Sequence, residues 1–294
     1  MKHESLLKNI GHFTFAFFIF YCQIGFSQNE KIIDRKPKPD HVISSKITKK
    51  DYQLYISFPN DYFQNDSIHY PVLYNLDGEL AFQVFHGTRI ALDMAKEIEK
   101  VIIVGVGSGT DKESWIKNRW ADYLPFKDKV IDSLYAPEGV ESGGGHLFLE
   151  SLKKEIIPFV EKKYRTNKKR GISGNSSGAL FVSYCLFNAT DIFEKFGINS
   201  PSLWWKENEM LRYEKSFADK NKVLNAKVFI SVGSLEGETM VPQITKFYYD
   251  IKSRNYKGLD LNWQTFQNET HSSVLPASIS RTLRTLYGIS PDSH

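Results

Sequence analysis

The chain has 294 residues, of which 41% are hydrophobic and 24% are charged, so it is long enough to bury a large core. Its formal net charge of +4 is spread along the chain without basic blocks, which argues against a protein that binds nucleic acid. No change in composition marks a linker, and a single α/β domain is therefore the favoured organisation.

The first 27 residues are predicted to be a secretory signal peptide rather than part of the fold. Lys2 and Lys8 precede an apolar stretch at 10–26, and the small residues Gly25 and Ser27 stand where a signal peptidase would cut. The apolar stretch is about 17 residues long and contains polar side chains, which makes it short and impure for a membrane anchor. We therefore expect an exported protein, periplasmic or secreted, with no stable membrane span after cleavage.

The two cysteines bear on processing and on disulfides. Cys22 follows the bulky Tyr21, whereas lipoprotein processing needs a small residue there, so a lipid anchor is not expected. The mature domain, predicted at 28–294, then retains only Cys185, which excludes an intramolecular disulfide.

From residue 41 onward, segments with strand-like and helix-like patterns alternate. Strands are predicted at 41–47, 52–58, 71–76, 101–106, 170–173, 196–199, 226–232 and 261–266, and helices at 80–98, 147–164, 179–187, 241–253 and 274–286. The first two strands suggest an antiparallel start. The alternation that follows predicts a mostly parallel sheet with helices on both faces, the architecture of an α/β-hydrolase.

Residues 174–178 read Gly-Asn-Ser-Ser-Gly, the G-x-S-x-G pattern of the nucleophile elbow in serine hydrolases. A strand must turn sharply into a helix with the serine at the apex, so glycines on either side are expected to relieve crowding. A chain of this length contains the pattern by accident roughly one time in ten. The strand-like stretch before it and the apolar run after it supply the required order, which predicts Ser176 as the nucleophile.

In α/β-hydrolases the catalytic acid and histidine follow the serine, each at the carboxyl end of a strand. Only His271 and His294 follow Ser176, and His294 is the terminal residue. His271 stands just after the last predicted strand. It is therefore the expected general base, which takes the serine proton and returns one to the leaving group.

The orienting acid is expected after the strand predicted at 226–232. Glu236 and Glu238 both stand there, and Glu236 is preferred because it is nearer the strand end. Glu238 stays open as the alternative, and so does a dyad of serine and histidine without an acid.

Two backbone N–H groups should form the oxyanion hole. One is that of Ser177, directly after the nucleophile. The other is that of Gly78 or Glu79, in the loop that follows the strand predicted at 71–76. Asp77 in this loop could equally be a simple turn residue.

Further stretches carry a resemblance to a known family. They run in order along most of the mature chain: 70–78, 119–125, 174–178, 200–205, 233–236 and 271–276. They resemble the putative esterase family of α/β-hydrolases, which includes esterase D-like enzymes and esterases of catecholate siderophores. The resemblance implies Ser176 and His271 as catalytic residues and an acid at or near Glu236. Two departures, Asn175 for the family's usual histidine and Ala179 for a second glycine, bear on substrate preference rather than on the reaction.

Substrate contacts are expected in the segment 108–145, which is too long for an ordinary loop and suggests a lid or binding segment. It carries four candidates: Trp115, Arg119, Trp120 and Tyr123. They could bind a planar acyl or phenolic group, or they could pack the segment down while Arg119 pairs with Asp122. Trp204 and Trp205 could likewise border the pocket or fill the core.

These features together predict an exported serine esterase that needs neither a metal nor a cofactor, since the sequence has no zinc, calcium or nucleotide motif. Its substrate would be a small-molecule ester of a siderophore, a phenol or an acylated sugar. Acyl transfer with the same three residues is one alternative. A non-catalytic binding protein on a hydrolase scaffold is another.

Overall fold

The structure is a computed structural model that describes residues 37–289, with the exception of 65, 110, 135 and 137–138. The predicted signal peptide at 1–27, with Cys22, and the terminal His294 lie outside the described residues. The signal peptide and its cleavage therefore stay predictions.

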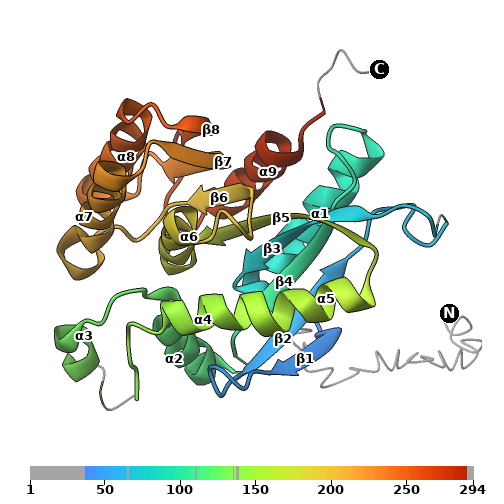
Figure 1. The fold of residues 1–294 in the computed structure, drawn as a ribbon, viewed down its shortest axis with the longest axis horizontal. Coiled ribbons are helices and arrows are strands. Elements are labelled where there is room, and N and C mark those ends of the chain that lie inside the picture. The colour runs from blue at the N-terminus through green and yellow to red at the C-terminus, as the bar shows by residue number, and fades with distance from the viewer. Residues whose placement is uncertain (1–36, 65, 110, 135, 137–138, 290–294) are drawn as a thin grey trace, which may run out of the picture. The chain divides into compact units, whose positions relative to one another are not determined.

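The centre of the domain is an eight-stranded sheet (Figure 1). Its strands are β1 (His41–Ser44), β2 (Asp51–Ser57), β3 (Tyr70–Leu76), β4 (Ile102–Gly107), β5 (Thr166–Asn175), β6 (Lys195–Asn199), β7 (Val223–Gly233) and β8 (Lys257–Phe266). They lie in the order β1-β2-β4-β3-β5-β6-β7-β8. The pairs β1–β2 and β2–β4 are antiparallel, and all other neighbours are parallel. The predicted mostly parallel sheet with an antiparallel start is confirmed.

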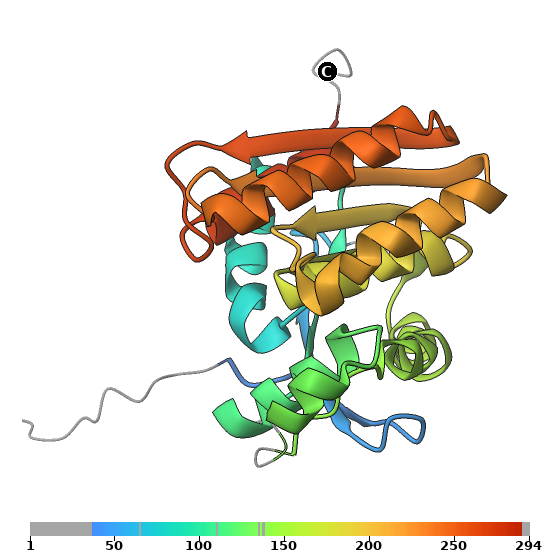
Figure 2. The same ribbon diagram turned by 90° about the vertical axis from the view of Figure 1, so that its left-hand side faces the viewer.

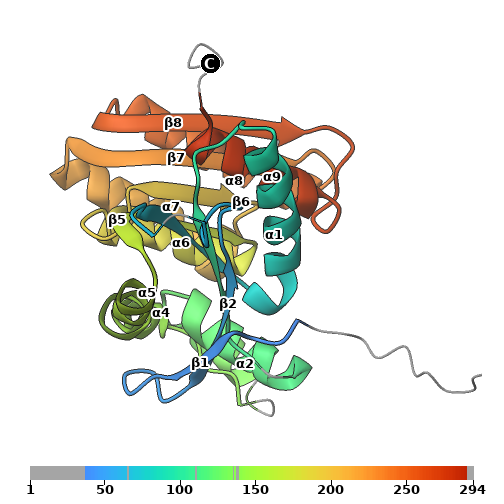
Figure 3. The same ribbon diagram turned by 90° about the vertical axis from the view of Figure 1, so that its right-hand side faces the viewer.

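Helices cover both faces of this sheet. They are α1 (Gly78–Met94), α2 (Lys112–Tyr123), α3 (Lys129–Leu134), α4 (Gly145–Ser151), the π-helical turn η2 (Leu152–Ile156), α5 (Ile157–Lys163), α6 (Ser177–Asn188), α7 (Trp205–Lys220), α8 (Gly237–Ser253) and α9 (Val274–Tyr287). On one face α1 and α9 lie side by side and share a core through Phe85 and Ile279 (Figure 3). On the other, α5 to α8 build a larger core around Phe181 and Phe247, with α7 and α8 lying across the last strands (Figure 2).

The fold differs from the sequence prediction in three helical regions. The segment 108–145 is not one long loop, because it contains α2 and α3. Helix α2 begins at a capping box between Asp111 and Ser114. The sequence did not predict this helix, because its largely polar residues form no clear apolar stripe. The sequence also did not predict helix α7, which is largely polar and has left-handed backbone angles at Lys206, Glu207 and Asn208 near its start. The helix predicted at 147–164 is interrupted by η2 next to Pro158, which has no N–H to continue the α-helical ladder.

Candidate active site

Ser176 stands at the apex of a strand-to-helix turn, between the end of β5 and the start of α6. Its φ of 58° and ψ of −122° lie in a strained region of the backbone map that side-chain-bearing residues rarely occupy. Gly174 is required here, because a Cβ on it would lie 2.5 Å from the carbonyl carbon of Gly178. A Cβ on Gly178 would make only an ordinary contact, 3.4 Å from Asp77 Oδ2. The expected need for a glycine on both sides of the serine thus holds for Gly174 alone.

One neighbour of the Ser176 side chain comes from the loop after β6. Ser176 Oγ lies 3.2 Å from Ser202 Oγ, and the backbone N–H of Ser202 donates to the carbonyl oxygen of Ser176 at 3.1 Å. Sequence reasoning missed this contact. The only signal for it was that Ser202 belongs to the stretch 200–205 that carries the family resemblance.

His271 and Glu236 meet at the carboxyl ends of the last two strands. Glu236 directly precedes α8, and His271 lies in the loop between β8 and α9. The imidazole Nδ1 lies 2.7 Å from Glu236 Oε2, and Glu238 is exposed. The carboxylate side chain is fully buried, whereas 40% of the histidine side chain is exposed. The acid is therefore held inside the protein while the imidazole reaches the surface of the site.

The second oxygen of Glu236 is fixed by two further donors. Its Oε1 accepts a hydrogen bond of 2.6 Å from Ser200 Oγ and another of 2.6 Å from the Gly233 N–H. Burial opposes ionisation of Glu236, but the hydrogen bonds from His271, Ser200 and Gly233 outweigh it and lower the pKa of the carboxyl. An ionised carboxylate can only accept, so the proton in its contact with His271 stays on Nδ1. This leaves Nε2 with a free lone pair. Sequence reasoning missed the role of Ser200.

Ser176 and His271 line the same cavity, which has a volume of about 450 Å³. Asp77, the residue that precedes α1, lines this cavity too, and Ser176 is itself the residue that precedes α6. The first N–H groups of a helix have no acceptor within the helix. The expected oxyanion donors, Gly78 or Glu79 and Ser177, are the first residues of these two helices. Gly78 packs so closely on β4 that a Cβ would lie 2.7 Å from the carbonyl carbon of Gly105.

Arg119 does not pair with Asp122, contrary to one of the two readings of this segment. Its Nε and Nη2 donate to Asp77 Oδ1 and Oδ2 at 2.8 and 3.1 Å, and Nη2 also donates to the Asn175 carbonyl at 3.3 Å. The guanidinium carbon lies 5.2 Å from the Trp115 ring centre and 5.7 Å from that of Tyr123. Arg119 therefore ties the loop before α1 to the backbone of the elbow.

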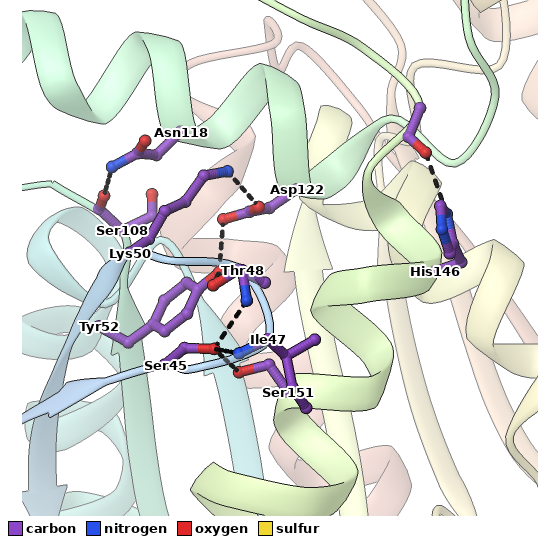
Figure 4. Close-up of polar contacts among 11 residues, drawn as sticks. Ser45, Ile47, Thr48, Lys50, Tyr52, Ser108, Asn118, Asp122, His146 and Ser151 are labelled. Atoms are coloured by element: carbon purple, nitrogen blue, oxygen red, sulfur yellow. Dashed lines mark hydrogen bonds and ion pairs between the residues drawn. The ribbon is translucent and has the colours of Figure 1, made fainter.

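Asp122 instead anchors α2 to the antiparallel side of the sheet (Figure 4). It accepts hydrogen bonds of 2.6 Å from Lys50 Nζ and 3.0 Å from the Tyr52 hydroxyl. One turn earlier, Asn118 Nδ2 donates to the Ser108 carbonyl at 2.6 Å, just past the end of β4. These contacts hold α2 in place, and with it the guanidinium of Arg119.

The structure separates the aromatic candidates for substrate contact into three groups. Trp115 lines the large cavity together with Arg119. A smaller cavity of about 80 Å³ beside Ser176 is lined by Trp120, Trp204 and Trp205, of which Trp204 is 42% exposed. Tyr123 is fully buried and its hydroxyl accepts the Asp77 N–H at 3.1 Å, so it supports the site without reaching either cavity.

Glu79, at the start of α1, is a largely buried carboxyl close to this site. Its Oε1 accepts the Ser108 N–H at 3.0 Å, whereas Oε2 is buried without a hydrogen-bond partner among the described residues. Burial raises the pKa of Glu79 from 4.5 to about 7. The folded protein therefore holds this proton at pH values where the unfolded chain has released it.

Glu79→Gln is expected to stabilise the protein at alkaline pH. Because the folded-state pKa is raised, the free energy of unfolding of the wild type falls as pH rises from about 4.5 through about 7. The loss from this group would reach up to about 3 kcal/mol. Urea unfolding of both proteins at pH 5 and pH 8 would show the advantage of the variant growing with pH. An equal difference at the two pH values would contradict this account of Glu79.

Within the described part of the chain, no cluster of three or more His, Cys, Asp or Glu side chains is arranged to hold a metal ion. None of the helices described for residues 37–289 combines the length and the apolar character needed to cross a membrane.

Comparison with known proteins agrees with the resemblance seen in the sequence. The family model described as "Putative esterase" matches residues 45–267. Ferri-bacillibactin esterase BesA of Bacillus subtilis is 28% identical over 264 residues, which is 85% of this chain and 89% of that protein.

Solved structures agree with this relationship. The BES protein of Bacillus cereus has 31% identity and a TM-score of 0.74, and the match covers 85% of this chain and 95% of that one. An IroE-like serine hydrolase of Shewanella oneidensis has 25% identity and a TM-score of 0.75, with 84% and 79% covered. The chain therefore belongs to the putative esterase family and is a carboxylic ester hydrolase with an α/β-hydrolase fold.

Proposed function

We propose that this esterase cleaves its substrate through an acyl-enzyme on Ser176, with His271 as the general base and Glu236 as the orienting acid. The observation that carries the proposal is the contact of 2.7 Å between Glu236 and His271, with His271 lining the same cavity as Ser176. The imidazole Nε2 accepts the Ser176 proton while Oγ attacks the ester carbonyl. The N–H of Ser177 and that of Gly78 or Glu79 stabilise the negative charge that develops on the carbonyl oxygen.

The second half of the reaction reverses the roles of the same groups. The alcohol leaves with the proton held by His271, and the acyl group stays on Ser176. A water molecule then gives its proton to the imidazole and attacks the acyl carbon, which releases the acid and restores the serine. Acyl transfer would differ only in using an alcohol in place of this water.

Burst kinetics with a para-nitrophenyl ester tests the proposal. An acyl-enzyme that is hydrolysed slowly releases nitrophenol equivalent to the amount of enzyme before the steady state begins. When an alcohol acceptor is added, analysis of the products distinguishes hydrolysis, which gives the free acid, from acyl transfer, which gives a new ester. Turnover that persists when the triad serine is absent would overturn the proposal.

Glu236→Gln is expected to lower kcat by about three to four orders of magnitude, whereas Glu238→Gln keeps nearly full turnover. The glutamine carbonyl would take the donors Ser200 and Gly233, so its NH₂ group would face His271 Nδ1. The imidazole then carries its proton on Nε2 and cannot accept one from Ser176. Steady-state kinetics of the two variants measures the difference. Similar small losses in both would favour a dyad of serine and histidine.

The names of relatives favour siderophore esters among the three substrate classes considered. BesA is a ferri-bacillibactin esterase, and a protein of Emericella nidulans named siderophore enterobactin esterase is 25% identical over 185 residues, 58% of this chain and 60% of that protein. A turnover screen across siderophore, phenolic and acetylated-sugar esters would rank the classes.

Export is part of the proposal and rests on the signal-like pattern of the first 27 residues. If a signal peptidase cuts after Ser27, the mature protein begins at Gln28. Amino-terminal sequencing of the protein recovered from the periplasm or the medium would show this end. Recovery of the uncleaved chain from the membrane fraction would contradict it.

A further inference from the structure

The large cavity beside Ser176 has an apolar wall made by two helices that are distant in sequence. We name this wall the apolar slot; its residues are Leu80, Ala81 and Phe85 of α1 and Leu275 and Ile279 of α9. The slot runs from the core to solvent, since Phe85 and Ile279 are almost fully buried while Leu80 is 59% exposed. An apolar group bound at Ser176 could therefore leave water along this wall.

The charged residues that line the same cavity offer no free positive charge to a ligand. Arg119 is the one lysine or arginine among the lining residues that the structure describes, and Asp77 holds it through both oxygens. Its other hydrogen bond among the described residues is to the backbone carbonyl of Asn175, and its guanidinium also lies over the rings of Trp115 and Tyr123. The charges of Asp77 and Arg119 cancel, and His271 must be neutral to act as a base.

An anionic substituent would be poorly accommodated in this cavity. It would lose hydration against the apolar slot without gaining a counter-ion, and burial of an unpaired charge is costly. It would also lie near the carboxylate of Asp77. A neutral apolar substituent has neither penalty and gains from the removal of its surface from water.

We propose that the site takes esters in which an uncharged, apolar acyl or alcohol group lies in the apolar slot between α1 and α9, and that it rejects esters with an anion at that place. The inference rests on the proposed function, because it places the scissile carbonyl at Ser176. A volume of about 450 Å³ is in the usual range for small-molecule sites, so a chain of several methylenes or an aromatic ring fits.

Two ester series test the inference, with rates expressed per Ser176 site titrated by a fluorophosphonate. In para-nitrophenyl acetate, butanoate and hexanoate the acyl group grows, and in ethyl, butyl and hexyl acetate the alcohol grows. The series whose variable group lies in the slot should gain about two- to fourfold in kcat/KM per methylene. A matched pair tests charge in the series that responds to length: para-nitrophenyl hemisuccinate against the pentanoate for the acyl group, or 4-acetoxybutanoate against pentyl acetate for the alcohol. The anionic member should be about 100-fold poorer than the neutral one.

Variants of α1 link these preferences to the slot. Ala81→Phe should fill the slot and lower kcat/KM for the longest ester much more than for the acetate, so that the gain per methylene is lost, and Gln83→Phe, at an exposed position of the same helix, is the control. Leu80→Lys changes an exposed rim position and needs no core repacking. It should raise kcat/KM for the anionic member of the matched pair relative to the neutral member by about tenfold.

The possible failures are distinguishable. Labelled Ser176 with rates independent of chain length in both series, or with equal rates on the two members of the matched pair, would overturn the inference and leave the proposed function standing. Absence of both labelling and ester turnover would overturn the two together.

Discussion

Ser176→Ala is expected to lower kcat by about five to six orders of magnitude, because the acyl-enzyme cannot form without the hydroxyl. The fold should be retained, since the side chain has one side-chain hydrogen-bond contact, to Ser202, among the described residues. Ester turnover and thermal unfolding of the purified variant measure the two effects separately. Loss of turnover together with an unchanged unfolding midpoint is the expected outcome.

Ser183→Ala is the matched control for this change. Ser183 is on the same helix, α6, and its hydroxyl is buried and donates to the Ala179 carbonyl at 2.8 Å. It is not among the residues that line either cavity. This variant should keep most of its turnover even if it is somewhat less stable. Full activity in Ser176→Ala would show that another group is the nucleophile.

His271→Ala is expected to cost about as much turnover as loss of the serine, because members of a catalytic triad act as a unit. In the wild type, protonation of the imidazole at acid pH removes the base, so the rate at subsaturating substrate should fall there. The variant should lack this fall. Rates measured from acid to mildly basic pH on both proteins test the assignment.

Two other variants show which group causes this fall in rate at acid pH, the acid limb of the pH profile. Glu79→Gln removes the carboxyl whose pKa is raised to about 7 by burial, and it should leave the limb in place. His146→Ala removes an exposed histidine that contacts the Gly143 carbonyl at the start of α4, and it should behave like the wild type (Figure 4). A His271 variant with wild-type turnover and the same limb would identify a different base.

The sequence predicted the parts of the fold that depend on local pattern. Each of the eight strands was expected with ends that lie within four residues of those observed, and β5, predicted at 170–173, is longer at both ends. The first residues of β5, at 166–169, are largely polar and exposed, so no apolar pattern marks them. The G-x-S-x-G motif worked as a signal because its geometry is local: β5 and α6 meet at Ser176.

Contacts between distant segments were harder to predict. Arg119 is three residues from Asp122, and a local pair was one natural reading, but the fold brings Asp77 into contact with two of the three donor nitrogens of Arg119. The hydrogen bond from Ser200 to Glu236 likewise joins loops that follow different strands. Such partners follow from the order of strands in the sheet, which sequence periodicity alone does not specify.

Arg119 also connects the two halves of the expected oxyanion hole. It binds the side chain of Asp77, before α1, and the backbone of Asn175, before the nucleophile. Both donor N–H groups belong to helix starts next to these residues. A fixed distance between the two donors is what preorganised stabilisation of an oxyanion requires.

The most direct test of the central claim is to identify the residue that a fluorophosphonate modifies. The account predicts one adduct per protein molecule, located by mass spectrometry of proteolytic peptides on Ser176, with loss of ester turnover in proportion to labelling. It also predicts that His271→Ala reacts far more slowly, because the serine is no longer activated. An adduct on another residue, or full turnover by protein that is completely labelled at Ser176, would contradict the account.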